Sequence, residues 1–280
     1  MPIARVNGIE IAYETYGDGY PLVLAHGYAA SKEMWDAQIG PFMERYRVVV
    51  YDVRGHGESE APPVDDAGYT IETLVEDQRA LMAHLGIERA FAGGLSLGGM
   101  IAMRFALTHP SMVRALLLCD TSPGMDTAGQ WAANRQLMEG IVRSQGAGAV
   151  MRGLYTQAAT RMGIQRREQA PAGILDFVQR VERLSPDGFL GVARAAGEAA
   201  SVLDRLGEIA APTLILTGDG DFFRGASEEM AERMPGARFV LINGSYHGTC
   251  LWQPEKFTSA VLDFLADVEA GRPVAGREER

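Results

Sequence analysis

The pentapeptide Gly94-Leu95-Ser96-Leu97-Gly98 combines a nucleophilic side chain with two flanking glycines. The apolar run 89–94 before it predicts a strand, and the run 97–108 predicts a helix that is apolar almost all round. A G-x-S-x-G pattern between a strand and a helix is typical of a tight turn that presents a serine hydroxyl above a sheet. The flanking glycines then keep side chains out of a crowded turn. A plain N-cap role for Ser96 is the alternative.

Phosphate binding is the other chemistry that glycine-rich loops perform. A Walker loop requires lysine after its last glycine, but Gly99 follows Gly98 here. A dinucleotide loop requires glycine two positions after its first glycine, yet Leu95 follows Gly93 and Ser96 follows Gly94 at that spacing. The stretch therefore predicts a turn that presents Ser96.

A serine nucleophile needs a base, and the base needs an orienting acid. With a serine on such a turn, the expected chain order is serine, acid, histidine. Of the five histidines, only His247 lies well beyond the serine, in a glycine-containing loop after the predicted strand 237–244. Asp219 and Asp221 follow the predicted strand 212–218, and both are candidates for the acid.

Several short apolar runs predict the strands that position these residues. Their interiors are continuous rather than alternating, which is typical of strands covered on both faces, and predicted helices lie between them. The predicted strands are 21–27, 46–52, 89–94, 113–120, 212–218 and 237–244, and the predicted helices are 71–85, 97–108, 225–233 and 254–268. A hairpin turning at Asn7-Gly8 precedes them. We expect an α/β fold with a mostly parallel sheet that binds its ligand at the carboxyl ends of the strands.

Residues 122–207 interrupt this alternation with helix-like sequence only. We expect them to form a helical cap over the carboxyl ends of the strands, inserted into a core made of 1–121 and 208–280. The tail 270–280 has no apolar periodicity and is predicted to be frayed or disordered.

The composition narrows the classes of partner. The 280 residues are 47% hydrophobic, and their net charge of −10 argues against binding nucleic acid or an anionic membrane. Cys119 and Cys250 lack metal-ligand spacing and are expected to be buried free thiols. Without a signal-peptide pattern or a spanning apolar run, a cytoplasmic location is expected. A homodimer remains an open alternative to a monomer.

Five motifs together resemble those of the α/β-hydrolase superfamily, over nearly the whole chain outside the cap. They are "HGYAASKEMWD" (26–36), "YDVRGHGESE" (51–60), "GLSLGG" (94–99), "LTGDGD" (216–221) and "GSYHGTCLWQPEKF" (244–257). The resemblance implies the α/β-hydrolase fold, with a mostly parallel eight-stranded sheet and a helical cap inserted after the sixth strand. It implies no cofactor and no metal.

The resemblance also assigns roles to individual residues. Ser96 is expected to attack a carbonyl carbon, His247 to move the proton, and Asp221 to orient the histidine. Asp120 is the rival acid, because some relatives carry the acid at the end of that strand. The backbone N–H groups of Tyr28 and Leu97 are expected to bind the oxyanion. His26, His56 and Arg54 are expected to be structural.

Among serine-containing members, "GLSLGGMIAMRFALTHPSMVRALLLCDTSPG" is most similar to 3-oxoadipate enol-lactonases and allied small-molecule esterases and lactonases. The implied reaction is hydrolysis of a small carboxylic ester or lactone. Three alternatives stay open: a C–C bond hydrolase of the meta-cleavage-product type, a cofactor-free perhydrolase or haloperoxidase, and a receptor or signalling protein on this fold.

The cap is expected to supply substrate selectivity. An apolar pocket is predicted from aromatic residues of the cap and the neighbouring loops, namely Trp131, Tyr155, Phe177, Phe189, Phe222 and Trp252. Arg152, Arg180 and Arg183 are candidates for binding a substrate carboxylate, with solvated helix-face positions as the alternative.

Overall fold

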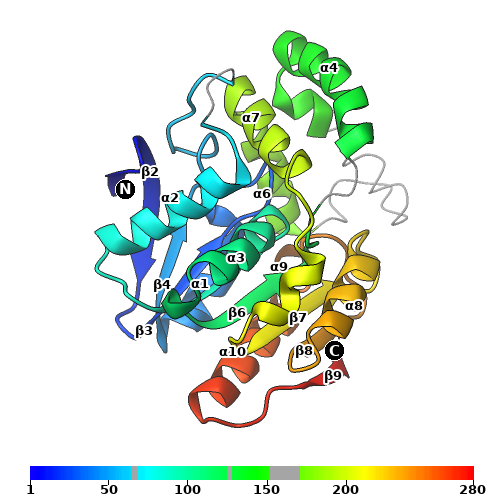
Figure 1. Cartoon of the computed structure of the whole chain (residues 1–280). Helices are drawn as coiled ribbons and strands as arrows, with labels where there is room; N and C mark the ends of the chain where they lie inside the picture. Colours follow the sequence, from blue (N-terminus) through cyan, green and yellow to red (C-terminus); the bar gives the residue numbers. More distant parts are fainter. Residues whose placement is uncertain (65–67, 125–127, 152–170) are drawn as a thin grey trace.

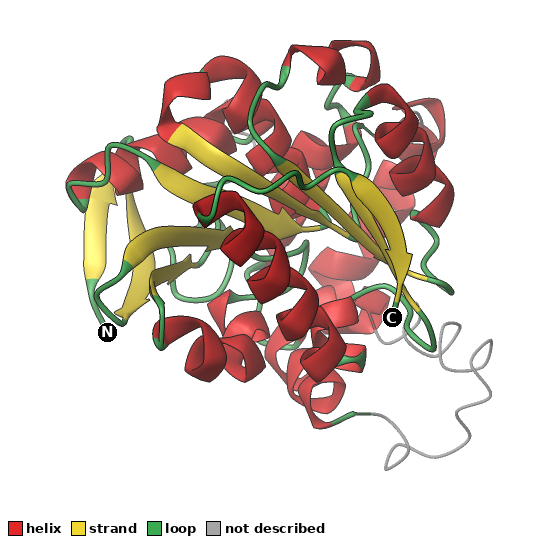
Figure 2. Cartoon of the chain, turned by 90° about the horizontal axis from the view of Figure 1, so that it is seen from below, coloured by secondary structure: helices red, strands yellow, loops and turns green. Residues whose placement is uncertain are grey.

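The structure is a computed structural model that describes residues 1–64, 68–124, 128–151 and 171–280. A twisted nine-stranded sheet runs through the molecule, and helices lie on both of its faces (Figures 1 and 2). The strands are β1 (Ile3–Val6), β2 (Ile9–Tyr16), β3 (Tyr20–Ala25), β4 (Tyr46–Tyr51), β5 (Ala90–Leu95), β6 (Val113–Cys119), β7 (Thr213–Gly218), β8 (Arg238–Ile242) and β9 (Gly276–Glu279). Their order in the sheet is β1-β2-β4-β3-β5-β6-β7-β8-β9.

The polarity of the sheet follows the predicted pattern. β1 and β2 form an antiparallel hairpin whose turn residues Asn7 and Gly8 both have positive φ, of 47° and 81°. β2 is antiparallel to β4, and every neighbouring pair from β4 to β9 is parallel. The carboxyl ends of β3, β5, β6, β7 and β8 therefore meet along one edge. The predicted strands are confirmed, with ends that differ by a few residues.

The C-terminal tail differs from its prediction. Residues expected to be frayed form β9, which pairs in parallel with β8 and makes nine strands rather than eight. Backbone hydrogen bonds pair Arg280 with Leu241 and Asn243, at 2.9 and 2.8 Å. Side chains in the strand are mostly exposed, so an edge strand held by its backbone leaves no apolar pattern in the sequence.

The main helices form two layers, one on each face of the sheet. The helices and short 3₁₀ turns are η1 (Lys32–Trp35), α1 (Asp36–Met43), α2 (Ile71–His84), α3 (Leu97–Thr108), η2 (Pro110–Met112), α4 (Ala128–Gln145), α6 (Ala172–Val181), α7 (Pro186–Gly197), η4 (Leu203–Glu208), α8 (Arg224–Arg233), α9 (Thr249–Trp252) and α10 (Pro254–Glu269). α2, α3 and α8 bury one face, and α1 and α10 bury the other. In the part of the chain that the structure describes, no helix is long and apolar enough to cross a membrane.

Helices α4, α6 and α7 lie between β6 and β7, in the block 122–207, and α4 and α7 appear at the top of Figure 1. They share a small apolar cluster that includes Val142, Val181 and Phe189, together with Ala29 from the loop after β3. α7 approaches the core closely, because a Cβ added at Gly188 would lie only 1.9 Å from the carbonyl oxygen of Gly55. A residue with a side chain at position 188 would collide with Gly55, so Gly188 allows α7 to approach the core this closely.

Candidate active site at the carboxyl edge of the sheet

Ser96 lies between β5 and α3 with φ 56° and ψ −114°, a conformation that residues other than glycine rarely adopt. Its side chain makes no capping hydrogen bond to α3, so the N-cap interpretation does not account for the serine. Ser96 is half-buried, whereas its neighbours from Phe91 to Met100 are buried. A strained backbone held in rigid surroundings is what presents a serine hydroxyl for chemistry.

The glycines beside Ser96 make room for neighbouring backbone. A Cβ at Gly98 would lie 2.1 Å from the carbonyl oxygen of Ala25, and one at Gly94 would lie 2.4 Å from the carbonyl carbon of Gly98. Neither glycine has a positive φ, so their role is close approach, and the unusual dihedral falls on Ser96 itself. A Cβ at Gly27 would lie 3.5 Å from Ser96 Cβ, which places the loop after β3 beside the serine.

His247 and Asp221 form a pair on the neighbouring strand ends. His247 Nδ1 lies 3.0 Å from Asp221 Oδ1, and the aspartate side chain is fully buried while the imidazole is partly exposed. The Phe223 N–H also donates to Asp221 Oδ1, at 2.9 Å. With Nδ1 directed at the carboxylate, the proton sits on Nδ1 and Nε2 is left as the basic nitrogen.

Electrostatics favour a charged carboxylate at Asp221. Burial by itself raises the pKa of this carboxyl, but the hydrogen bond and the charge of His247 outweigh burial and lower it below its usual range. A buried acid that stays ionised orients an imidazole and stabilises the imidazolium that forms after proton transfer. Asp219, the other candidate, instead accepts the Ser245 N–H at 3.0 Å and shapes the histidine loop.

The loop that follows β3 is held by two buried histidines. His26 Nε2 accepts the N–H of Val53 at 2.9 Å, and its Nδ1 lies 2.7 Å from the Gly27 carbonyl oxygen. His56 Nε2 accepts the N–H of Ala29 at 3.0 Å. Burial lowers the pKa of both imidazoles, to about 3 for His56, so both are neutral. Their expected structural role agrees with these contacts.

Two candidate oxyanion-binding N–H groups belong to the segments that adjoin the serine. Leu97 is the first residue of α3, so its N–H has no partner within the helix. Tyr28 lies between Gly27 and Ala29, in the loop that the histidines hold, and its hydroxyl donates to the carbonyl oxygen of Phe189 at 3.0 Å. An N–H at a helix start and an N–H of a rigid loop suit the binding of a developing negative charge.

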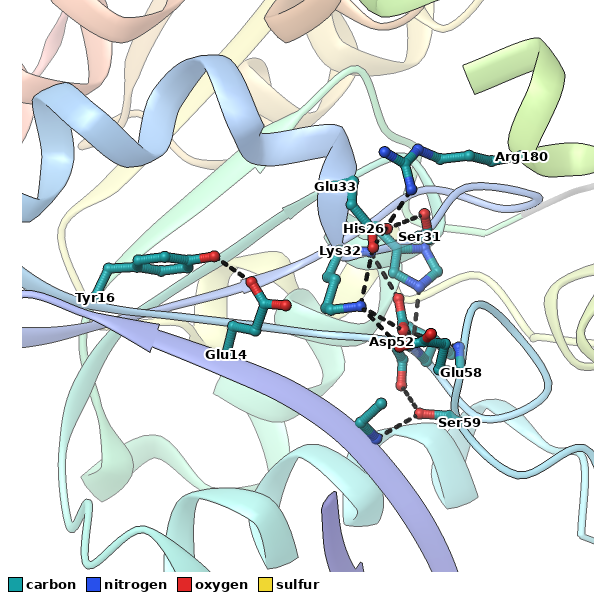
Figure 3. A network of polar contacts seen from close by, with 12 residues as sticks. Glu14, Tyr16, His26, Ser31, Lys32, Glu33, Asp52, Glu58, Ser59 and Arg180 are labelled. Atoms are coloured by element: carbon teal, nitrogen blue, oxygen red, sulfur yellow. Dashed lines mark hydrogen bonds and ion pairs between the residues drawn. The ribbon is translucent and has the colours of Figure 1, made fainter. Parts of the chain in front are cut away.

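Behind this loop, a polar network reaches from the loop after β3 to Arg180 of α6 (Figure 3). The buried Lys32 Nζ donates to Asp52 Oδ2 at 3.2 Å and to Glu33 Oε1 at 3.0 Å. Burial raises the pKa of Glu33, but bonds from Ser31 and Lys32 lower it overall to about 2. Arg180 of α6 lies 3.5 Å from Glu33 Oε1. This candidate carboxylate-binding arginine is therefore paired within the protein.

The residues predicted to line a pocket have different surroundings. Phe222 is 70% exposed, and its ring stacks on that of His247 with centroids 4.2 Å apart. Phe189 is fully buried against the ring of Tyr28, which gives it a packing role. Phe177 is partly buried in α6, and Trp252 of α9 meets Tyr246 edge-on.

Three other predicted binding residues cannot be placed: the side chain of Trp131, and both Tyr155 and Arg152, lie outside the described residues. Arg183, beyond α6, is exposed.

Sequence reasoning missed the residues that support the acid and the base. Phe223 contributes its N–H to Asp221, and its ring packs edge-on against His247 with centroids 5.6 Å apart. Thr249 binds Asp120 through its N–H and its hydroxyl, at 2.7 and 2.8 Å. Their position two residues after Asp221 and His247 was the only signal that could have found them. No cluster of three metal-ligating side chains occurs in the described ranges.

Comparison with known proteins agrees with this architecture. Residues 20–254 match the family model described as the alpha/beta hydrolase fold. The 3-oxoadipate enol-lactonase 2 of Acinetobacter baylyi is 29% identical over 264 residues, which are 90% of this chain and 92% of that protein. The solved enol-lactonase of Burkholderia xenovorans is 27% identical with a TM-score of 0.82, over 95% of this chain and 100% of that one.

A thermophilic esterase from Thermogutta terrifontis, solved with malate bound, is 30% identical with a TM-score of 0.85. That alignment covers 96% of this chain and 99% of the esterase. The match to the family model extends over more than four-fifths of the sequence and contains Ser96, Asp221 and His247. This chain belongs to the alpha/beta hydrolase fold family and is a hydrolase similar to esterases and lactonases.

Proposed function

We propose that the protein hydrolyses a small carboxylic ester or lactone through an acyl-enzyme formed on Ser96. The observation that carries the proposal is the hydrogen-bonded pair of His247 and Asp221, at 3.0 Å, on strand ends of the same sheet edge as the strained Ser96. A serine, an oriented imidazole and a buried carboxylate together constitute an acyl-transfer apparatus. The enol-lactonase and esterase relatives support the substrate class.

In the first half-reaction, Ser96 Oγ attacks the carbonyl carbon while His247 Nε2 takes the hydroxyl proton. The oxyanion of the tetrahedral intermediate accepts hydrogen bonds from the N–H groups of Leu97 and Tyr28. Loss of one such donor typically costs roughly 10²- to 10³-fold in rate. The imidazolium then returns the proton to the departing alkoxide, and Asp221 stabilises its charge.

In the second half-reaction, His247 takes a proton from water, and the resulting hydroxide attacks the acyl group on Ser96. As the second tetrahedral intermediate collapses, the imidazolium returns its proton to Ser96 Oγ, which releases the acid and restores the serine and the base. With a lactone, the leaving alkoxide stays attached to the acyl group, so a single hydroxy acid is released. These steps use only side chains and backbone groups of the chain.

We treat 122–207 as the cap that shapes the acyl pocket, on the core formed by 1–121 and 208–280. The apolar cluster shared by α4, α6, α7 and Ala29 supports this division, because it joins the helical block to the loop that carries Tyr28. Phe222, stacked on His247 and largely exposed, offers an apolar surface beside the base.

The test is Ser96→Ala, measured with a p-nitrophenyl ester of a short acid and with a fluorophosphonate probe. We expect the variant to stay folded, to lose turnover and to lose labelling, whereas the native protein is labelled at Ser96. Full activity of Ser96→Ala would overturn the proposal. Simple lactones, a C–C cleavage substrate and acetate with peroxide, assayed on the same preparation, separate hydrolysis of esters and lactones from the alternative reactions.

A further inference from the structure

Asp120 is a buried carboxyl group at the centre of the candidate site. It directly follows β6, which lies between β5 with Ser96 and β7 with Asp221. Its φ is 44°, a left-handed conformation that is uncommon outside glycine, and it has no exposed surface. Its N–H donates to the carbonyl oxygen of Leu216 at 2.8 Å, which fixes it against β7.

The carboxyl of Asp120 binds the segment that follows His247. Oδ2 accepts the N–H of Gly248 at 3.2 Å, and it accepts the N–H and hydroxyl of Thr249 at 2.7 and 2.8 Å. Oδ1 accepts the N–H of Gly218, at the end of β7, at 3.2 Å. These four bonds join three consecutive strand ends, and they fix the backbone immediately after the imidazole.

The turn that carries Ser96 is bonded to the two residues that flank Asp120. The N–H of Ser96 donates to the carbonyl oxygen of Cys119 at 2.9 Å, and the hydroxyl of Thr121 donates to the carbonyl oxygen of Ser96 at 2.6 Å. The residues on both sides of Asp120 therefore hold the serine backbone, while Asp120 itself holds the histidine loop.

Asp120 and Asp221 also lie within hydrogen-bond contact of each other. Ionisation of one buried carboxyl disfavours ionisation of its neighbour, and this opposes the bonds from Thr249, which lower the pKa of Asp120. Burial, and then the negative charge of Asp221, raise the pKa of Asp120 well above its usual range. Among the described residues, the thiols of Cys119 and Cys250 also lie near Asp120, and burial raises their pKa well above the ordinary value. His247 pairs with Asp221.

From this geometry we infer that Asp120 is a positioning residue. Its neutral carboxyl holds the histidine loop in place and donates a hydrogen bond to the ionised Asp221. The inference rests on the proposed acyl transfer, and it gives the two acids different tasks. Asp221 orients His247 through Nδ1, while Asp120 orients Asp221 and the backbone of Gly248 and Thr249 without contacting substrate.

Asparagine and alanine substitutions at Asp120 test this role. In Asp120→Asn, the amide oxygen can accept the bonds from Thr249, and the NH2 can donate to Asp221. The hydrogen bond that the Gly218 N–H donates to Oδ1 is then lost. We expect it to retain kcat within about tenfold, because a single net hydrogen bond contributes about 1 kcal/mol. Asp120→Ala loosens the loop and is expected to lower kcat by roughly 10²-fold, with a smaller change in KM.

The pH profile of kcat/KM supplies a readout that general loosening does not move. Its acid limb reports protonation of the catalytic base in the free enzyme. If Asp120 is neutral in the native enzyme, Asp120→Asn leaves this limb unchanged. A shift of the limb to lower pH would show that Asp120 carries a charge, and it would overturn the inference.

Equal losses of kcat in Asp120→Asn and Asp120→Ala would also overturn it, as would native activity in Asp120→Ala. Circular dichroism establishes that each variant is folded, and if Asp120→Ala does not fold, the asparagine variant and its pH profile decide. Failure of the proposed function is recognised separately, since Ser96→Ala would then keep its activity and the native protein would not be labelled at Ser96.

Discussion

The sheet edge that carries Ser96, Asp221 and His247 and the helical block between β6 and β7 are built differently. At the edge, hydrogen bonds fix the backbone of Ser96, the carboxylate of Asp221 and the loop that carries His247. In the block, a small apolar cluster and an ion pair between Arg180 and Glu33 join the helices to the core. The hydrogen bonds at the edge allow little change in geometry, whereas the apolar contacts of α4 and α6 tolerate exchange of apolar residues of similar size. Under the proposed function, chemistry belongs to the rigid region and substrate selection to the more adaptable one.

The largest effect is expected from Asp221→Asn. Its amide can donate to His247 Nδ1 and so favours the wrong tautomer, and a loss of roughly 10⁴-fold in kcat is expected. The measurement is kcat for a p-nitrophenyl ester, with native-like circular dichroism as the control. A loss below tenfold would show that Asp221 is not the acid that orients His247. The assignment of the chemistry to the sheet edge would then fail.

Acid should lower the free energy of unfolding, because two buried histidines hold the loop after β3. His26 and His56 are neutral when folded, whereas an unfolded histidine titrates near 6.5. Below that value the unfolded chain binds more protons, so the free energy of unfolding falls as pH drops toward the folded pKa, about 3 for His56. The slope contributed by each histidine is about 1.4 kcal/mol per pH unit.

Urea unfolding of His56→Gln between pH 7 and 4.5 checks this expectation. Its stability should depend less steeply on pH than that of the native protein. His84→Gln is the matched control because His84 is exposed, and it should retain the native slope. Parallel curves for His56→Gln and the native protein would contradict the argument.

An intermediate effect is expected where α7 meets the core. The alanine Cβ in Gly188→Ala would lie 1.9 Å from the carbonyl oxygen of Gly55, so backbone must move. Overpacking of this kind costs about 1–3 kcal/mol in the free energy of unfolding, measured with urea.

Gly140→Ala in α4 is the control for this substitution, since its Cβ would meet no atom within 4 Å. Alanine there should stabilise the helix by up to about 1 kcal/mol. Equal effects of the two substitutions would show that α7 is no more constrained than α4.

The smallest effect is expected from Arg180→Ala. The Arg180–Glu33 pair is partly exposed, and such pairs contribute about 0.2–1 kcal/mol. Because Arg180 is already paired with Glu33, the KM of Arg180→Ala should change little. The small change should be the same for an anionic and a neutral ester. Arg183→Ala controls for charge on the same segment. A large rise in KM for the anionic ester alone would restore the substrate-carboxylate role of Arg180.

The sequence predicted the sheet and the candidate triad because their signals are local. Continuous apolar runs identify buried strands, and the motifs around Ser96, Asp221 and His247 follow the strand ends. Helix α1 and strand β9 were missed, since Pro41 interrupts α1 and β9 is held by backbone bonds.

Contacts between distant segments were also beyond the sequence. The bonds from Gly248 and Thr249 to Asp120 join residues more than 120 positions apart. The pairing of Arg180 with Glu33 likewise depends on where α6 settles against the loop after β3. Residue types identify such groups as candidates, but only packing decides which partner each one meets.

The contact between Gly188 and Gly55 has a consequence for recombining this protein with its relatives. Gly191 faces the ring of Tyr69 in the same way, since an added Cβ would lie 2.4 Å from it. Helix α7 therefore packs as part of the core, although it lies in the block 122–207 between β6 and β7. A chimera that imports a foreign selectivity module should place its second junction before Pro186, so that the native α7 is retained. A module that also replaces α7, with its junction after Gly197, would need small residues at the positions of Gly188 and Gly191.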